Sequence, residues 1–106
     1  MALYDRIAAF YDPWSRSVTE DVQFYVEHAV ESGGPVVELA VGTGRIAVPI
    51  ARAGIPVIGV DTSPGMLAVA RAAAAAAGVS ELVDLRVGDL RPPPVSERVH
   101  LVICPF

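Results

Sequence analysis

The sequence is poor in several residue types, and each shortage excludes a class of protein. A single cysteine, Cys104, excludes a disulfide framework and any metal site built from several cysteines, and it is typical of a reducing compartment. Lysine is absent, because all eight basic residues are arginine, and this excludes a lysine nucleophile, a Schiff base and a Walker lysine. No apolar run approaches the roughly 20 residues that cross a bilayer, and the N-terminus has no signal-peptide pattern. We therefore expect a cytoplasmic protein without a membrane partner.

Charge and hydropathy further limit the class of protein and its partners. The chain has 106 residues, of which 53% are hydrophobic, so it is long enough for one folded domain and too apolar for a disordered chain. Its net charge is −4 and it has no cluster of basic residues. Because phosphate binding needs local positive charge, nucleic acid is not expected as a partner.

The hydrophobic pattern predicts one helix followed by alternating strands and helices. A capping box at Ser17–Glu20 begins the first helix, and the pair Gly33–Gly34 ends it. Pro49 lies inside the second expected helix and predicts a kink or a late start there. Strands are expected over 35–40, 55–60, 82–87 and 99–104, and further helices over 45–53 and 64–77. This order is typical of a parallel sheet with right-handed crossovers.

A glycine-rich turn directly follows the first expected strand. Gly42 and Gly44 allow unusual backbone dihedral angles and a close approach of a ligand to the backbone. Asp61 ends the next strand, nineteen positions after Gly42, where an acidic side chain can accept both hydroxyls of a ribose. The pattern therefore favours a nucleoside half-site over a tight turn without a ligand.

Two cofactors compete for this half-site. Residues 42–47 match the G-x-G-x-x-A form of the dinucleotide fingerprint, which would make the chain the NAD(P)-binding half of an oxidoreductase. Glu38 argues against that interpretation, because a carboxylate buried in an apolar strand needs a partner and a pyrophosphate would only repel it. A ligand with an ammonium group and a sulfonium would satisfy Glu38, and S-adenosylmethionine is such a ligand.

From residue 35 onward the sequence resembles the class I S-adenosylmethionine-dependent methyltransferases. Val36–Ile50 and Gly59–Leu67 are similar to the family's first two motifs, Val87–Leu90 to the third and Leu101–Phe106 to the fourth. The resemblance implies a Rossmann-like, doubly wound α/β fold with strand order 3-2-1-4. It also implies S-adenosylmethionine as cofactor and transfer of its methyl group to an N, O, S or C atom of an acceptor, which we expect to be a small molecule.

The resemblance assigns roles to several residues of the first motif and to Asp61 of the second. Glu38 would lie near the amino group of the cofactor, directly or through water. The backbone of Ala40, Gly42 and Gly44 would pass under the methionine and ribose portions, and Asp61 would hold the ribose hydroxyls. Ala40 departs from the glycine most often found at its position.

The later motifs would surround the adenine and the methyl group. By resemblance, Thr62 and Met66 flank the adenine ring, and Asp89 and the backbone of Leu90 bind its edge. Cys104 would make a backbone contact beside the transferred methyl group. Two of these residues have simpler alternatives, since Met66 is equally suited to the core and Asp89 to capping a turn.

The N-terminal segment, residues 1–34, is expected to form an aromatic arm and a helix ahead of a core over residues 35–106. In the family, aromatic residues ahead of the first motif often cover the cofactor, and Tyr11 would bind its methionine carboxylate or lie near its sulfonium. His28 and His100 have no ligand partners at metal spacing, so no metal is predicted. The charged pair Glu97–Arg98 is interpreted as part of a solvated loop.

No catalytic residue is predicted, because orientation of the reactants alone can contribute ~7–11 kcal/mol. Family members continue beyond a fourth strand, so the sheet is expected to be truncated there and to contain the cofactor half of the fold. An exposed fourth strand also predicts self-association through its edge. A module that binds a nucleoside without catalysis remains an alternative.

Overall fold

A parallel sheet forms the centre of the computed structural model, which describes residues 19–89 and 94–105. The strands lie in the order β3-β2-β1-β4, and every neighbouring pair is parallel. Their bounds are β1 (Val36–Leu39), β2 (Val57–Asp61), β3 (Val83–Val87) and β4 (Leu101–Ile103). The predicted Rossmann-like α/β architecture and the strand order 3-2-1-4 are therefore confirmed.

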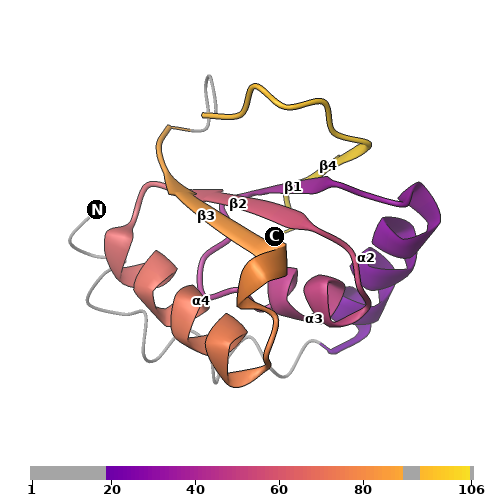
Figure 1. Ribbon diagram of the computed structural model, residues 1–106, viewed down its shortest axis with the longest axis horizontal. Coiled ribbons are helices and arrows are strands. Elements are labelled where there is room, and N and C mark those ends of the chain that lie inside the picture. Colours follow the sequence, from indigo (N-terminus) through magenta and orange to yellow (C-terminus); the bar gives the residue numbers. More distant parts are fainter. Residues whose placement is uncertain (1–18, 90–93, 106) are drawn as a thin grey trace.

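The described helices all lie on one face of this sheet, below it in Figure 1. They are α2 (Thr19–Ser32), α3 (Ala47–Arg52), α4 (Pro64–Ala76) and the short 3-10 helix η1 (Ser80–Leu82). The late start of the second expected helix is confirmed, since α3 places Pro49 in its first turn, where a missing N–H costs nothing. None of these helices is long and apolar enough to cross a membrane.

The start of α4 follows directly from its sequence. The Ser63 hydroxyl accepts a hydrogen bond from the Met66 N–H at 3.2 Å, and Pro64 occupies the first helical position. Both features satisfy or remove a free donor of the first turn. Because Ser63 comes two residues after the end of β2, this cap fixes where the connection from β2 turns into the helix.

The main core fills the space between the helices and the sheet. Val36, Val57 and Ile103 supply buried side chains from the sheet, and Ala29 and Leu67 meet them from α2 and α4. The helix α2 thus packs into the same core as the sheet. The division of the chain at residue 34 stays a prediction.

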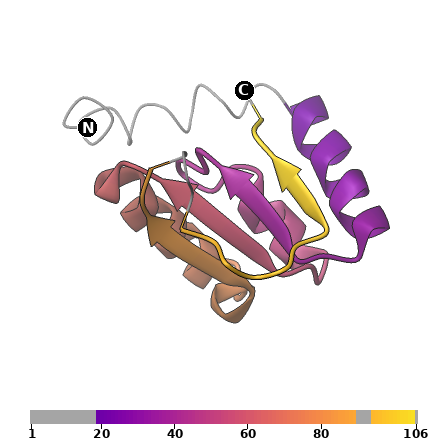
Figure 2. The ribbon, with the colours of Figure 1, turned by 90° about the horizontal axis from the view of Figure 1, so that it is seen from above.

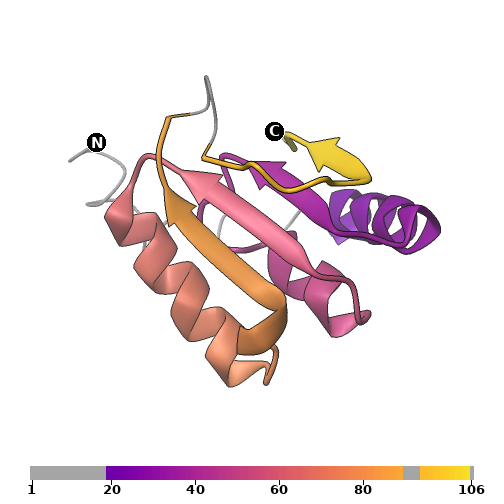
Figure 3. The ribbon, with the colours of Figure 1, turned by 45° about the horizontal axis from the view of Figure 1, so that its top comes forward.

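The opposite face of the sheet is covered differently. Val37, Ile58 and Val60 are buried there, and Val95 and Val99 pack against them. These two valines belong to the segment that leads from β3 to β4 and crosses this face, as Figures 2 and 3 show. Among the described residues no helix lies on this face. A loop over residues 94–100 therefore covers part of this face in place of a helix.

Candidate functional site

Most of the predicted site residues lie at or just beyond the carboxyl ends of the strands, and Glu38 lies within β1. All four strands point the same way in Figure 2, so these ends share one edge of the sheet. The glycine turn follows β1, Asp61 ends β2, Asp89 follows β3 and Cys104 follows β4. Tyr11 and Leu90 lie outside the described residues. The structure thus brings the other predicted residues to the edge where ligands of open α/β sheets bind.

The backbone after β1 takes a left-handed course through three residues. Ala40, Gly42 and Gly44 have φ angles of 57°, 60° and 83°. For an L-residue such as Ala40 this conformation costs roughly 1–2 kcal/mol. Ala40 therefore carries a backbone strain that its place in the sequence did not reveal.

The two glycines of the turn face different surroundings. A Cβ atom added to Gly42 would have the Ala40 carbonyl oxygen as its nearest described neighbour, at 4.0 Å. A Cβ atom on Gly44 would lie 3.2 Å from a Val48 methyl and 3.3 Å from the Ala70 Cβ. Gly44 thus permits close packing of α4 on the turn, whereas no residue of the described ranges fills the space beside Gly42.

The Asp61 carboxylate joins the two turns at this edge. Its Oδ2 accepts a hydrogen bond from the Gly42 N–H and its Oδ1 accepts one from the Ser63 N–H, each at 2.9 Å. The Asp61 carbonyl oxygen accepts a third from the Gly88 N–H at 3.1 Å. Each carboxylate oxygen keeps acceptor capacity for a further donor. The sequence predicted the place of Asp61 but not its role as a tie between the β1 and β2 turns.

Glu38 is the most unusual side chain of the site. It is only 3% exposed, and its Oε1 has no hydrogen-bond partner among the described residues. Burial raises the pKa of its carboxyl well above the usual range, while the Arg45 charge and the Ala47 N–H lower it and the Asp61 charge raises it again. A buried carboxyl oxygen without a hydrogen bond is costly, so the site favours a donor such as a cation beside the Glu38 Oε1.

The remaining predicted residues differ in exposure. Met66 is buried in the first turn of α4, so it contributes to the core, and its contact with an adenine ring stays a prediction. Thr62 is half-buried, whereas Asp89 and Cys104 are exposed. His28 is exposed as well, with its ring centroid 4.5 Å from that of Phe24.

The sequence did not predict one polar cluster, which joins β3 to the segment that follows it. Glu97 is exposed as expected for a solvated loop, but it forms an ion pair with Arg86 of β3, eleven positions earlier in the chain. Arg86 also pairs with Asp84 at 2.8 Å. A proline-rich stretch separates the two partners in the sequence, and no periodic pattern relates them, so the sequence alone carried no signal for this pair.

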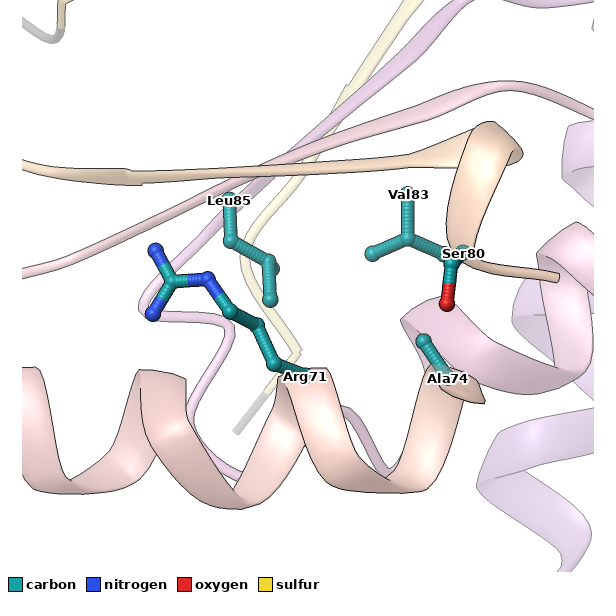
Figure 4. A pocket seen from close by; sticks show the side chains of 5 residues that line it. All are labelled: Arg71, Ala74, Ser80, Val83 and Leu85. Carbon is teal, nitrogen blue, oxygen red and sulfur yellow. The ribbon is translucent and has the colours of Figure 1, made fainter. Parts of the chain in front are cut away.

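A hollow of about 270 Å³ lies elsewhere in the fold, between α4 and the edge strand β3. Figure 4 shows the Arg71 side chain extending from α4 toward β3. Ser80 and Val83, which also line it, stand at the amino end of β3, away from the glycine turn. Across residues 19–89 and 94–105, no group of three or more metal-binding side chains gathers.

The proteins to which this chain is similar are methyltransferases. Residues 36–106 match the methyltransferase domain family. A putative methyltransferase from Geobacillus sp. (strain WCH70) is 35% identical over 79 residues, which cover 73% of this chain and 31% of that protein. The chain thus spans about a third of the length of this curated relative.

Two solved structures are similar at the level of the fold and the sequence. An RNA methyltransferase from Salinibacter ruber, in complex with S-adenosylhomocysteine, is 33% identical with a TM-score of 0.70, covering 78% of this chain and 55% of that one. A methyltransferase from Thiobacillus denitrificans, also with S-adenosylhomocysteine, is 29% identical with a TM-score of 0.71, covering 80% and 35%. With its 3-2-1-4 sheet and glycine turn, the chain belongs to the class I S-adenosylmethionine-dependent methyltransferase family.

Proposed function

We propose that the chain binds S-adenosylmethionine at the carboxyl ends of β1, β2 and β3 and supplies the cofactor site of a methyltransferase. The observation that carries the proposal is the buried Glu38 carboxyl, whose Oε1 has no described partner. Two further features support it, the space beside Gly42 that the described part of the chain leaves unfilled and the remaining acceptor capacity of Asp61. An ammonium group, a methionine chain and a ribose match these three features in that order.

In this proposal the chain's own residues bind and orient. Glu38 accepts from the ammonium group, Asp61 accepts from the ribose hydroxyls, and the Gly42 backbone lies against the ligand without a side chain between them. The cofactor supplies an electrophilic methyl group, so the protein's contribution is placement and exclusion of water. Cys104, at the end of β4, and Asp89, after β3, would bound the site on its two sides.

We further propose that the acceptor is a small molecule and that the protein acts in the cytoplasm. The net charge of −4 and the absence of lysine support a small acceptor, because nucleic acid needs a basic surface. The similar protein from Salinibacter ruber is an RNA methyltransferase. Transfer of labelled methyl to RNA, and to none of a panel of small amines, phenols and thiols, would therefore contradict this part. Self-association through the edge of β4 stays a prediction.

Calorimetric titration with S-adenosylhomocysteine and with NAD tests the proposed cofactor. We expect S-adenosylhomocysteine to bind and NAD not to bind, because a pyrophosphate beside Glu38 would meet a second negative charge. Adenosine is the comparison ligand, and it should bind more weakly than S-adenosylhomocysteine because it lacks the whole homocysteine group, including the ammonium. Binding of NAD alone would overturn the proposal.

The two glycines of the turn allow a paired test of the ligand space. Both have positive φ, so Gly42→Ala and Gly44→Ala introduce similar backbone strain. We expect Gly42→Ala to weaken S-adenosylhomocysteine binding at least tenfold, since a clash worth about 1.4 kcal/mol suffices. Gly44→Ala should instead lower the free energy of unfolding by a further 1–3 kcal/mol or so through overpacking against Ala70. Titration and urea unfolding separate the two effects, and equal affinities for both variants would contradict the assignment.

A further inference from the structure

Arg86 fastens the segment after β3 to the sheet. Its Nη1 donates to the Pro94 carbonyl oxygen at 2.7 Å and to the Glu97 Oε1 at 3.0 Å. Its Nη2 donates to the other Glu97 oxygen, so the guanidinium holds the carboxylate with two parallel hydrogen bonds. Hydrogen bonding to Arg86 lowers the pKa of the Glu97 carboxyl to about 2, so the pair keeps its charge at all but very acid pH.

The segment after β3 makes a second contact with the end of that strand. A Cβ atom on Gly88 would lie 2.8 Å and 2.9 Å from the Cγ and Cδ of Pro94, so these two residues are in direct contact. The Gly88 N–H donates to the Asp61 carbonyl oxygen at 3.1 Å. Asp89 therefore follows a backbone position that is held by Pro94 on one side and by the end of β2 on the other.

We propose that Arg86 is a positioning residue for adenine recognition, which fixes Asp89 beside the Asp61 turn by clamping Pro94 and Glu97 to β3. The inference rests on the proposed function, in which Asp89 binds the adenine amino group. An exposed ion pair contributes little to global stability. Its loss should therefore act locally, on the fraction of molecules that hold Asp89 in the binding position.

The molecule provides its own matched control. Asp84 and Glu97 are both exposed acids that pair with the Arg86 Nη2. Asp84 lies on β3 itself, two residues from Arg86, so its ion pair fastens nothing to the strand. Glu97→Gln removes the charge that holds the crossing segment, whereas Asp84→Asn removes an equivalent charge and leaves that segment attached.

The test compares S-adenosylhomocysteine with S-inosylhomocysteine, in which a carbonyl oxygen replaces the adenine amino group. We expect Glu97→Gln and Arg86→Ala to bind S-adenosylhomocysteine roughly tenfold more weakly. This is the loss that follows when the fraction of molecules that hold Asp89 in the binding position falls to about a tenth. Both variants should also lose most of the preference over the inosine analogue. Asp84→Asn should keep the affinity and the preference of the unaltered protein, and equal loss in all three variants would overturn the inference.

Hydrogen exchange gives a readout that does not depend on any ligand. The Gly88 amide should exchange faster in Glu97→Gln than in Asp84→Asn, because its bond to Asp61 is held in place by the clamp. If the unaltered protein binds no S-adenosylhomocysteine, the proposed function fails, whatever the exchange rates are. If it binds but Glu97→Gln retains affinity, preference and Gly88 protection, only the clamp is wrong.

Discussion

Asp61→Asn is expected to reduce the affinity for S-adenosylhomocysteine by on the order of 100-fold, since hydrogen bonds to a charged group contribute about 1.5–3 kcal/mol each. The carboxylate would lose its charge toward the ribose. The amide nitrogen of the variant side chain would also face one of the two N–H groups, of Gly42 or Ser63, from which the carboxylate now accepts hydrogen bonds. Calorimetric titration of the variant measures the loss.

A second ligand separates the direct role of Asp61 from its role in holding the turns. If Asp61 binds the ribose, the unaltered protein should prefer S-adenosylhomocysteine over its 2′-deoxy analogue, and Asp61→Asn should bind both equally poorly. If Asp61 only ties Gly42 to Ser63, the variant should lose the same factor for both ligands and keep the preference. The pair of ligands and the pair of proteins form a double-mutant cycle, in which only a direct contact gives a coupling energy.

The fold was predictable because its local signals agree with one another. The runs before Gly42 and before Asp61 are short, apolar and rich in β-branched residues, and Ser63 and Pro64 mark the start of α4 without ambiguity. The ends of elements were less certain. The fourth strand was expected over 99–104, yet β4 begins only at Leu101, because the residues before it cross the sheet face and supply Val95 and Val99 to its cover.

The site was predictable in its positions and not in its internal bonds. A strand end followed by a glycine turn fixes where Gly42 and Asp61 must lie, since parallel strands end at one edge. The bond between them depends on side-chain direction, which no sequence period encodes. The Arg86–Glu97 pair is more remote still, because it joins two segments through a crossing of the sheet face that lacks regular structure.

Glu38 combines a cost to the fold with a use in binding. Its side chain points to the helix side of the sheet, as does that of Val36 two residues earlier, and there it lies near Arg45 and the Ala47 N–H. Burial raises its pKa, so above the ordinary value of 4.5 the folded chain holds this proton more tightly than the unfolded chain does. The contribution of Glu38 to stability is therefore fully present below pH 4.5 and is lost as the pH rises through its raised folded-state pKa.

Glu38→Gln should consequently change stability and cofactor affinity in opposite directions. A neutral amide costs less to bury than a carboxylate, so the free energy of unfolding of the variant should rise relative to the unaltered protein as pH increases, by up to ~1.4 kcal/mol per pH unit while Glu38 titrates. Binding should weaken by a factor on the order of 30 or more, since truncating a buried charge pair costs about 2–5 kcal/mol. Urea unfolding and titration between pH 5 and about 7.5, below the pKa of an α-amino group, measure both.

The pH profile of binding distinguishes a cofactor ligand from a helix support. If Glu38 meets an ammonium group, affinity in the unaltered protein must rise with pH as the carboxyl ionises, and this slope must vanish in Glu38→Gln. Glu27→Gln, at an exposed position of α2, should keep both the slope and the stability unchanged. A Glu38→Gln variant that unfolds more easily and binds as well as before would instead make Glu38 a support for the start of α3. The opposed changes in stability and affinity are thus the signature of a carboxyl that the fold tolerates because the ligand needs it.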